Sequence, residues 1–346
     1  MAMNAGRRYV VHGAGAVGGT IGARLHESGH AVVLIARGEH LEALRRDGLR
    51  YGDAERTRTL TIPAVGHPSE IDWRDDDVVV LAVKSQDTDG ALADLMAAAP
   101  ASITVVCAQN GVENERRALR CFAEVVGMCV MLPATHVAPG AVDADSLPVV
   151  GVLDIGRYPH GVDDVVRDVA ADLSGSGFRS APDEAVMRWK YEKLLTNLST
   201  ALRALCGLES DDDAAATAIR ARLVGAIRQE ALACYDAEGI VLPTDEERAA
   251  RWDGAVTLRP IPGRPRTAGS AWQSLARATG AIEVDGINGE IVLLGRLHGI
   301  ATPVNVAVQA LANDAARRRL PPGSFPPAEV ARAAGVEAGA EEEGVA

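Results

Sequence analysis

The sequence predicts an α/β domain at the N-terminus, followed by a mainly α-helical domain. Short apolar runs alternate with helix-like stretches over residues 7–182, which is typical of a parallel sheet covered by helices. From Pro182 onward the apolar periodicity becomes mainly helical. We therefore expect an N-terminal domain over 7–182 and a helical domain over 183–320.

The composition excludes several classes of function. The chain has 346 residues, of which 47% are hydrophobic and 24% charged, and its formal net charge is −12. An acidic chain without a basic stripe is a poor match for nucleic acid or an anionic membrane. No apolar run is long enough to span a bilayer, and we expect no signal peptide. The five cysteines form no C-x-x-C pair, which predicts reduced thiols and a cytoplasmic location.

The first apolar run ends in a glycine-rich turn. Tyr9–His12 predicts a buried strand, and a G-x-G-x-x-G pattern follows it before a helix-like stretch. The first glycine would permit a tight turn, the second would let a pyrophosphate approach the backbone, and the third would let the helix pack on the strand. The positive end of the helix dipole also suits phosphates. We predict a Rossmann-like dinucleotide-binding domain, with a purely structural turn as the alternative. The predicted cofactor-binding residues are Gly13, Ala14, Gly15, Ala16, Val17 and Gly18.

The end of the second predicted strand, Ala31–Ile35, distinguishes NAD from NADP. NAD enzymes usually carry Asp or Glu there for the ribose 2′-hydroxyl, whereas NADP enzymes offer Arg to the 2′-phosphate. Arg37 stands at this end, and Glu39 comes later, where it suits the first turn of the next helix. We therefore predict NADP(H) as the cofactor. The alternative is that Arg37 is a solvated loop residue.

Two further strand ends carry polar side chains. The apolar run 78–83 leads into Lys84, and the run 103–106 leads into a segment that contains Asn110. Ligands bind outside the carboxyl ends of strands in open α/β sheets. We therefore expect Lys84 and Asn110 beside a cofactor or substrate, although each alone also fits an ordinary loop.

The stretch 186–205 predicts an amphipathic helix with polar residues on one face. Trp189, Lys193 and Asn197 are spaced four apart, so they share a face. A lysine beside apolar packing is partly desolvated, which lowers its pKa and suits it to donate a proton to a carbonyl oxygen. Spacing alone also fits a solvated lysine, which is the commoner case.

A second polar cluster in the helical half begins at Glu283. It contains Gly286, Gly289 and Gly295, each of which costs roughly 1 kcal/mol relative to alanine inside a helix. Such glycines predict a close backbone approach to another helix or to a ligand. No metal-ligand spacing and no Ser/His/Asp arrangement is evident, so we expect neither a metal site nor a hydrolase.

The C-terminal residues 321–346 are rich in Pro, Gly, Ala and Glu. Such a segment can bury too little apolar surface to offset the conformational entropy that it would lose on ordering. We therefore expect residues 321–346 to be disordered.

Taken in order, these motifs resemble the ketopantoate reductase family, the 2-dehydropantoate 2-reductases. The similarity runs over roughly residues 8–315. Each motif alone is weak, but the ordered set is specific. The matching segments are Gly13–Gly18, Arg37, Val83–Gln86, Gln109–Gly111, Trp189–Asn197, Glu283–Gly289 and His298–Pro303.

The resemblance implies an NADPH-dependent reduction of 2-dehydropantoate to pantoate. In that family a Rossmann domain binds NADPH and a helical domain closes over a small 2-oxo acid. The resemblance implies that Lys193 is the general acid, that Lys84 lies near the cofactor and that Asn110 also serves the nicotinamide region. It also suggests a homodimer. The implied substrate-binding residues are Asn110, Asn197, Ser270 and Glu283.

Two departures from the family pattern lie on the substrate side. The family often has a second Asn one turn after Asn197, where this chain has Ala201, and the Ser270 segment needs a one-residue gap before Glu283. An NADP-dependent reductase of a different 2-oxo acid, keto compound or imine therefore stays open. A non-catalytic NADP(H) sensor is a third possibility, against which the proton-donating lysine argues.

Overall fold

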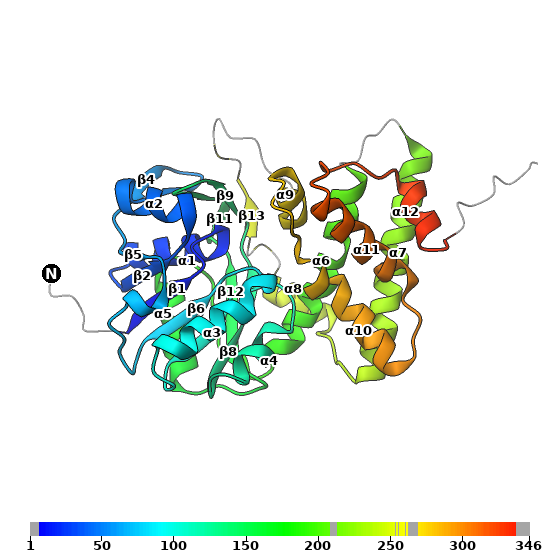
Figure 1. Cartoon of the computed structure of the whole chain (residues 1–346). Helices are drawn as coiled ribbons and strands as arrows, with labels where there is room; N and C mark the ends of the chain where they lie inside the picture. The colour runs from blue at the N-terminus through cyan, green and yellow to red at the C-terminus, as the bar shows by residue number, and fades with distance from the viewer. Residues whose placement is uncertain are drawn as a thin grey trace, which may run out of the picture. The chain divides into compact units, whose positions relative to one another are not determined.

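The computed structural model describes residues 7–207, 213–252, 254, 256–259, 261 and 269–336. The chain divides into two compact units (Figure 1). Unit 1 consists of Met1–Lys190 and Pro243–Arg266, and unit 2 of Tyr191–Leu242 and Thr267–Ala346. The division falls within one continuous helix, α6 (Val186–Cys206).

The centre of unit 1 is a seven-stranded sheet of order β12-β8-β7-β6-β1-β2-β5. Neighbouring strands are parallel except for the edge strand β12, which is antiparallel to β8. Its inner strands are mostly apolar and rich in Val because both faces of a parallel sheet are covered. The strands are β1 (Arg8–His12), β2 (Ala31–Ile35), β5 (Ala64–Val65), β6 (Val78–Leu81), β7 (Thr104–Cys107), β8 (Glu124–Met131) and β12 (Val152–Arg157).

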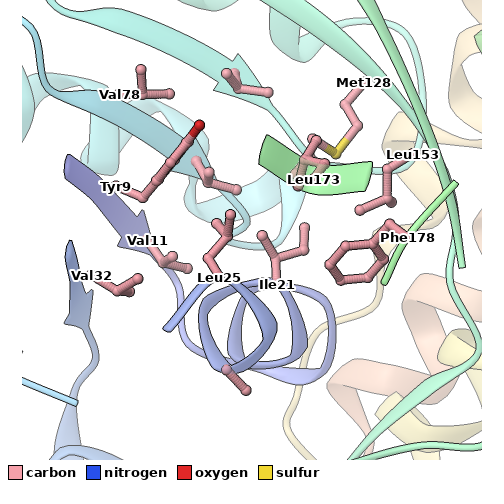
Figure 2. Packing of buried hydrophobic residues seen from close by; sticks show 14 of the residues in the cluster. Tyr9, Val11, Ile21, Leu25, Val32, Val78, Met128, Leu153, Leu173 and Phe178 are labelled. Atoms are coloured by element: carbon pink, nitrogen blue, oxygen red, sulfur yellow. The ribbon is translucent and has the colours of Figure 1, made fainter. Parts of the chain in front are cut away.

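Helices pack on both faces of this sheet. Side chains of α1 (Ala16–Glu27) and α5 (Asp164–Gly175) share one core cluster, shown in Figure 2. Side chains of α3 (Thr88–Ala98) and α4 (Asn114–Leu119) share the other cluster. The adjacent residues Val10 and Val11 of β1 belong to opposite clusters, as the alternation of side chains along a strand requires. This architecture confirms the predicted α/β domain.

A smaller sheet of order β4-β3-β10-β9 extends unit 1. The hairpin of β9 and β10 turns at Gly140, where φ is +74°. A third sheet pairs β11 with β13. The remaining elements of unit 1 are α2 (Gly38–Asp47), β3 (Leu49–Gly52), β4 (Thr57–Leu60), η1 (Pro68–Glu70), η2 (Ser85–Asp87), β9 (Ala134–Ala138), β10 (Ala141–Ala144), β11 (Ser146–Pro148), α8 (Asp245–Trp252) and β13 (Val256–Leu258).

Unit 2 is helical, as the sequence predicts. Buried amides join its helices: Asn288 donates to the carbonyl oxygen of Leu198 (3.0 Å) and to Asn305 Oδ1 (2.9 Å). The Glu230 carboxylate accepts the backbone N–H groups of Val304 and Asn305, which stabilises the start of α11. Besides the later part of α6, the elements are α7 (Ala214–Glu238), α9 (Ser270–Ala276), η3 (Glu283–Gly286), α10 (Asn288–His298), α11 (Pro303–Arg317) and α12 (Pro327–Ala333).

The observed units differ from the expected boundary at residue 182. Residues 183–190 and Pro243–Arg266 belong to unit 1, because β13 pairs with β11 and α8 is tied to unit 1 by its arginines. The C-terminal segment also differs from the expected disorder. Residues 327–333 form α12, which packs on α7 with Val330 and Ala331 buried. Residues 337–346 lie outside the described part of the chain.

Arg251 anchors α8 to unit 1. Its Nε donates to Asp154 Oδ2 and its Nη1 to Asp183 Oδ2, both at 2.6 Å. The guanidinium also stacks 4.0 Å from the ring centre of Trp189. Asp154 is only 1% exposed, and Arg251 is its cationic partner.

Replacing Arg251 by Leu is expected to lower the free energy of unfolding by about 3–5 kcal/mol, because it strands the buried Asp154 charge. The matched control is Arg248→Leu on the same helix, whose partner Asp245 has a 96% exposed side chain. That loss should be below about 1 kcal/mol. Urea unfolding of both variants measures the difference. Equal losses would contradict the anchoring role of Arg251.

Candidate functional site

The carboxyl ends of four parallel strands lie level along one edge of the sheet in unit 1. His12 pairs with Ile35 on one side and Leu81 on the other, and Leu81 pairs with Cys107. The predicted cofactor residues follow these four ends directly in the chain. The fold therefore brings the segments around Gly13, Arg37, Lys84 and Asn110 to one edge.

Three glycines of the first turn have different surroundings. A Cβ at Gly13, where φ is +104°, would lie 2.6 Å from the backbone nitrogen of Val83. A Cβ at Gly18 would lie 2.1 Å from the carbonyl oxygen of Gly13. By contrast, a Cβ at Gly15 would meet no atom within 4 Å among the described residues. Packing thus accounts for Gly13 and Gly18, whereas Gly15 leaves open space against the backbone.

The start of α1 faces the same space. Ala16 and Val17 open this helix and are partly exposed. Among the described residues, no side chain caps the helix, and its first turn contains no acidic residue. Its N–H groups and positive dipole end favour an anion. Together with the open space at Gly15, these features fit the pyrophosphate of a dinucleotide.

His40 holds the glycine turn from α2, a contact that the sequence analysis missed. Its Nδ1 accepts the backbone N–H of Gly140 (2.8 Å), so its Nε2 carries the proton and donates to the carbonyl oxygen of Ala14 (2.7 Å). His136 Nε2 lies 3.2 Å from the same Nδ1. Burial lowers the pKa of His40, which favours this neutral form. The available signal was its place in the first turn of the helix after Arg37.

Arg37 lies just beyond the end of β2, as the sequence predicts, and precedes α2. Its side chain is 82% exposed, and Nη2 lies 3.1 Å from Asp87 Oδ1 of η2. An exposed pair of this kind contributes about 0–1 kcal/mol. The weak pair therefore keeps the guanidinium near the strand ends, and most of its surface stays exposed to bind an anion.

The segments of Lys84 and Asn110 are joined by a buried polar network. Gln109 Nε2 donates to the carbonyl oxygen of Val83 and to Thr88 Oγ1, both at 2.8 Å. Thr88 Oγ1 donates to Asn114 Oδ1 (2.8 Å), and Asn114 Nδ2 donates to the carbonyl oxygen of Asn110 (3.3 Å). Lys84 and Asn110 themselves are partly exposed. The network therefore fixes the two loops while leaving their predicted functional side chains accessible.

Lys190 of α6 is the second residue that the sequence analysis missed. It is 3% exposed, and its Nζ lies 2.5 Å from Glu115 Oε1, 3.0 Å from the carbonyl oxygen of Gln109 and 3.2 Å from that of Met128. The signal in the sequence was its position four residues from both Val186 and Leu194, on the buried stripe of the helix. A lysine at such a position needs an internal partner.

The predicted substrate residues lie on three elements of unit 2. Lys193 and Asn197 are one turn apart on α6, and both are partly exposed. Glu283 begins η3 and is partly exposed, and Ser270 begins α9 and is exposed. Ala201, where the family often has an Asn, is buried and 3% exposed.

Close packing within unit 2 explains two of the three glycines after Glu283. A Cβ at Gly289 would lie 2.8 Å from the side chain of Gln309, and a Cβ at Gly295 would lie 2.7 Å from the carbonyl oxygen of Ile300. These two glycines therefore allow other parts of unit 2 to approach the backbone of α10 closely. Gly286 ends η3, before α10 begins.

Other classes of site find no support in the part of the chain that the structure describes. It contains no group of three His, Cys, Asp or Glu placed to hold a metal ion. None of the helices described has the length and apolar character needed to cross a membrane. The five cysteines are free thiols.

Both halves of the chain match models of one protein family. Residues 9–159 match the model described as "Ketopantoate reductase PanE/ApbA". Residues 185–316 match the model of its C-terminal part. The two matches are consecutive and cover most of the chain.

Curated relatives carry the name 2-dehydropantoate 2-reductase. The protein from Halobacterium salinarum is 31% identical over 307 residues, which are 86% of this chain and 95% of that protein. The protein from Pyrococcus horikoshii is 28% identical over 193 residues, and this match spans 55% of the chain and 60% of that relative.

Solved structures share the fold. A PanE/ApbA family ketopantoate reductase from Ralstonia eutropha superposes with a TM-score of 0.73 at 27% identity, covering 90% of this chain and 99% of that one. A D-mandelate dehydrogenase with NADH and anilino(oxo)acetate superposes with a TM-score of 0.74 at 23% identity and the same coverage. The second likeness concerns the fold alone. The family models and the full-length Halobacterium match show that the chain belongs to the ketopantoate reductase family.

Proposed function

We propose that this protein reduces 2-dehydropantoate to pantoate with NADPH, with Lys193 as the general acid. Family membership makes the chain an oxidoreductase that acts on a CH–OH/C=O group. The choice of substrate, of NADPH over NADH and of the proton donor goes further and rests on particular residues.

The distribution of lysines carries the proposal. The chain contains only three lysines, Lys84, Lys190 and Lys193, among 35 basic residues. An arginine keeps its proton at any ordinary pH, whereas a lysine can release one. Lys190 is buried with its ammonium engaged by three protein oxygens. Lys193, which the motif assigns as the acid, is partly exposed and can meet a substrate.

The proposed reaction needs a proton at the keto oxygen and charge stabilisation there. The ammonium of Lys193 donates this proton and stabilises the developing alkoxide, then regains a proton from solvent. Ser270 holds the substrate carboxylate and Glu283 its hydroxyl group, while the amides of Asn110 and Asn197 orient the substrate. When bound, the reduced nicotinamide supplies the hydride to the keto carbon.

The cofactor proposal rests on unit 1. Gly13–Gly18 surrounds the open backbone at Gly15, which accepts the pyrophosphate. Arg37 meets the 2′-phosphate, and Lys84 and Asn110 serve the nicotinamide end. The structural relative with NADH is a D-mandelate dehydrogenase of under a quarter identity, so the preference for NADPH is argued from Arg37 alone.

The second candidate function is reduction of another 2-oxo acid on the same scaffold. The buried Ala201 favours it, because this position offers a methyl group where the family often has an amide. Other branched 2-oxo acids are therefore the comparison substrates.

The activity test follows NADPH oxidation by absorbance with 2-dehydropantoate and with other 2-oxo acids. We expect kcat/KM of about 10⁴ M⁻¹s⁻¹ or more with 2-dehydropantoate. Lys193→Ala should lower kcat by about 10²–10⁴-fold, as expected for loss of a general acid. NADPH affinity, measured by fluorescence titration, should stay near the parent value. A kcat within a few-fold of the parent would refute the assignment of Lys193.

Substituting Gly15 and Gly18 separates cofactor binding from packing. Gly15→Ala fills the open space at the backbone, so NADPH affinity should fall at least about tenfold. The thermal midpoint should change little. Gly18→Ala forces a Cβ against the carbonyl oxygen of Gly13, which should cost about 1–3 kcal/mol of stability. Unaltered NADPH affinity in a folded Gly15→Ala variant would contradict the proposed pyrophosphate site.

Arg37→Ala tests the cofactor preference. Losing a charge-assisted contact to the 2′-phosphate should weaken NADPH binding by about 1.5–3 kcal/mol. NADH lacks that phosphate, so its affinity should be unaffected. Arg45→Ala, which removes an exposed arginine further along α2, is the control. Equal losses for the two cofactors in Arg37→Ala would argue against an NADPH-selective site.

A further inference from the structure

Lys190 connects four segments of unit 1 through one buried ammonium. It extends from α6 to Glu115 of α4, to the carbonyl oxygen of Gln109 after β7 and to that of Met128 in β8. Both ionic side chains are at most 2% exposed. The ammonium therefore donates hydrogen bonds to two carbonyl oxygens and forms an ion pair with the Glu115 carboxylate, whose two oxygens accept no hydrogen bond among the described residues.

This arrangement requires the geometry of an ammonium. An ammonium directs three donors tetrahedrally from one atom, whereas a guanidinium spreads its donors in a plane. The chain has arginine at 32 of its 35 basic positions, yet it has lysine at this buried point. Two carbonyl acceptors and one carboxylate counter-ion around a single nitrogen account for that choice.

One of the two carbonyl acceptors belongs to the predicted site. The carbonyl of Gln109 and the N–H of Asn110 belong to the same planar peptide unit. The hydrogen bond from Lys190 therefore fixes the orientation of the peptide plane that precedes the Cα atom of Asn110. On the far side, Asn114 Nδ2 donates to the carbonyl oxygen of Asn110 at 3.3 Å. The backbone of Asn110 is thus held at both of its peptide units.

We propose that Lys190 is a positioning residue that orients Asn110 through the Gln109 carbonyl, a role that requires an ammonium and not merely a positive charge. This inference rests on the proposed function, because Asn110 is there assigned to the substrate and nicotinamide. Lys190 itself touches neither. Loss of Lys190 therefore impairs turnover more than cofactor binding, which depends chiefly on the glycine turn and Arg37.

The decisive variant removes both charges together. Lys190→Met alone would strand the Glu115 carboxylate, whereas a buried pair replaced by apolar residues of similar size is often tolerated. In K190M/E115M we expect a thermal midpoint near that of the parent and NADPH affinity within about threefold. We expect kcat with the preferred 2-oxo acid to fall at least about tenfold, as for a small misplacement of a reacting group. A parent-like kcat in the folded variant would overturn the proposal.

Two comparisons complete the test. K190R keeps the charge but not the tetrahedral donors, so it should leave kcat low, and full activity would overturn the requirement for an ammonium. The matched control is R8M/D77L. Arg8 and the buried Asp77 form a pair of similar length at the opposite, amino edge of the same sheet, and its loss should leave kcat unchanged.

A second variant tests the same role if the double variant does not fold. If K190M/E115M does not fold, E115Q takes its place, since it keeps the shape but weakens the hold on the ammonium. Its kcat should fall about fivefold or more at constant NADPH affinity, and a parent-like kcat would count against positioning. Failure of the parent protein to reduce any 2-oxo acid would instead refute the proposed function.

Discussion

The buried ammonium of Lys190 is the interaction on which the strand edge of unit 1 depends. It holds α4, α6 and the segments around Gln109 and Met128 at one nitrogen. Burying a charge is costly unless it is paired and hydrogen-bonded. Here the ammonium is paired with Glu115 and hydrogen-bonded to two carbonyl oxygens, whereas the Glu115 carboxylate has this ion pair and no hydrogen bond among the described residues. The side chain of Gln109 in turn donates a hydrogen bond to the carbonyl oxygen of Val83, just before Lys84. A largely buried polar network therefore supports two loops that carry partly exposed polar residues.

The glycine turn depends on a different constraint, because two of its positions have no room for a side chain. Gly13 and Gly18 are required by contacts inside the protein, since added Cβ atoms would lie 2.6 and 2.1 Å from backbone atoms. Gly15 has no such contact among the described residues. His40 adds a fixed donor to the carbonyl of Ala14. The turn is thus held by internal contacts and is open at Gly15, where a phosphate group can approach.

Much of this arrangement could be predicted from the sequence because local patterns encode it. The strand 78–81, the G-x-G-x-x-G turn and the helix from Val186 each depend on near neighbours in the chain, and the structure contains them. The contacts of Lys190 and His40 join residues far apart in the sequence, which spacing does not reveal. The return of Pro243–Arg266 to unit 1 depends likewise on distant partners such as Asp154. Composition misjudged residues 327–333, because a short stretch with Val330 and Ala331 on one face is enough to pack α12.

The central claim is that the chain delivers hydride from NADPH to the keto carbon of a 2-oxo acid. The most direct test uses NADPH carrying deuterium at both C4 positions of the nicotinamide, with 2-dehydropantoate as the substrate. The product is analysed by mass spectrometry and proton NMR. The account predicts one deuterium at C2 of pantoate in each product molecule and loss of the C2 proton signal. Product formed without deuterium, or cofactor bound without any transfer, would contradict it.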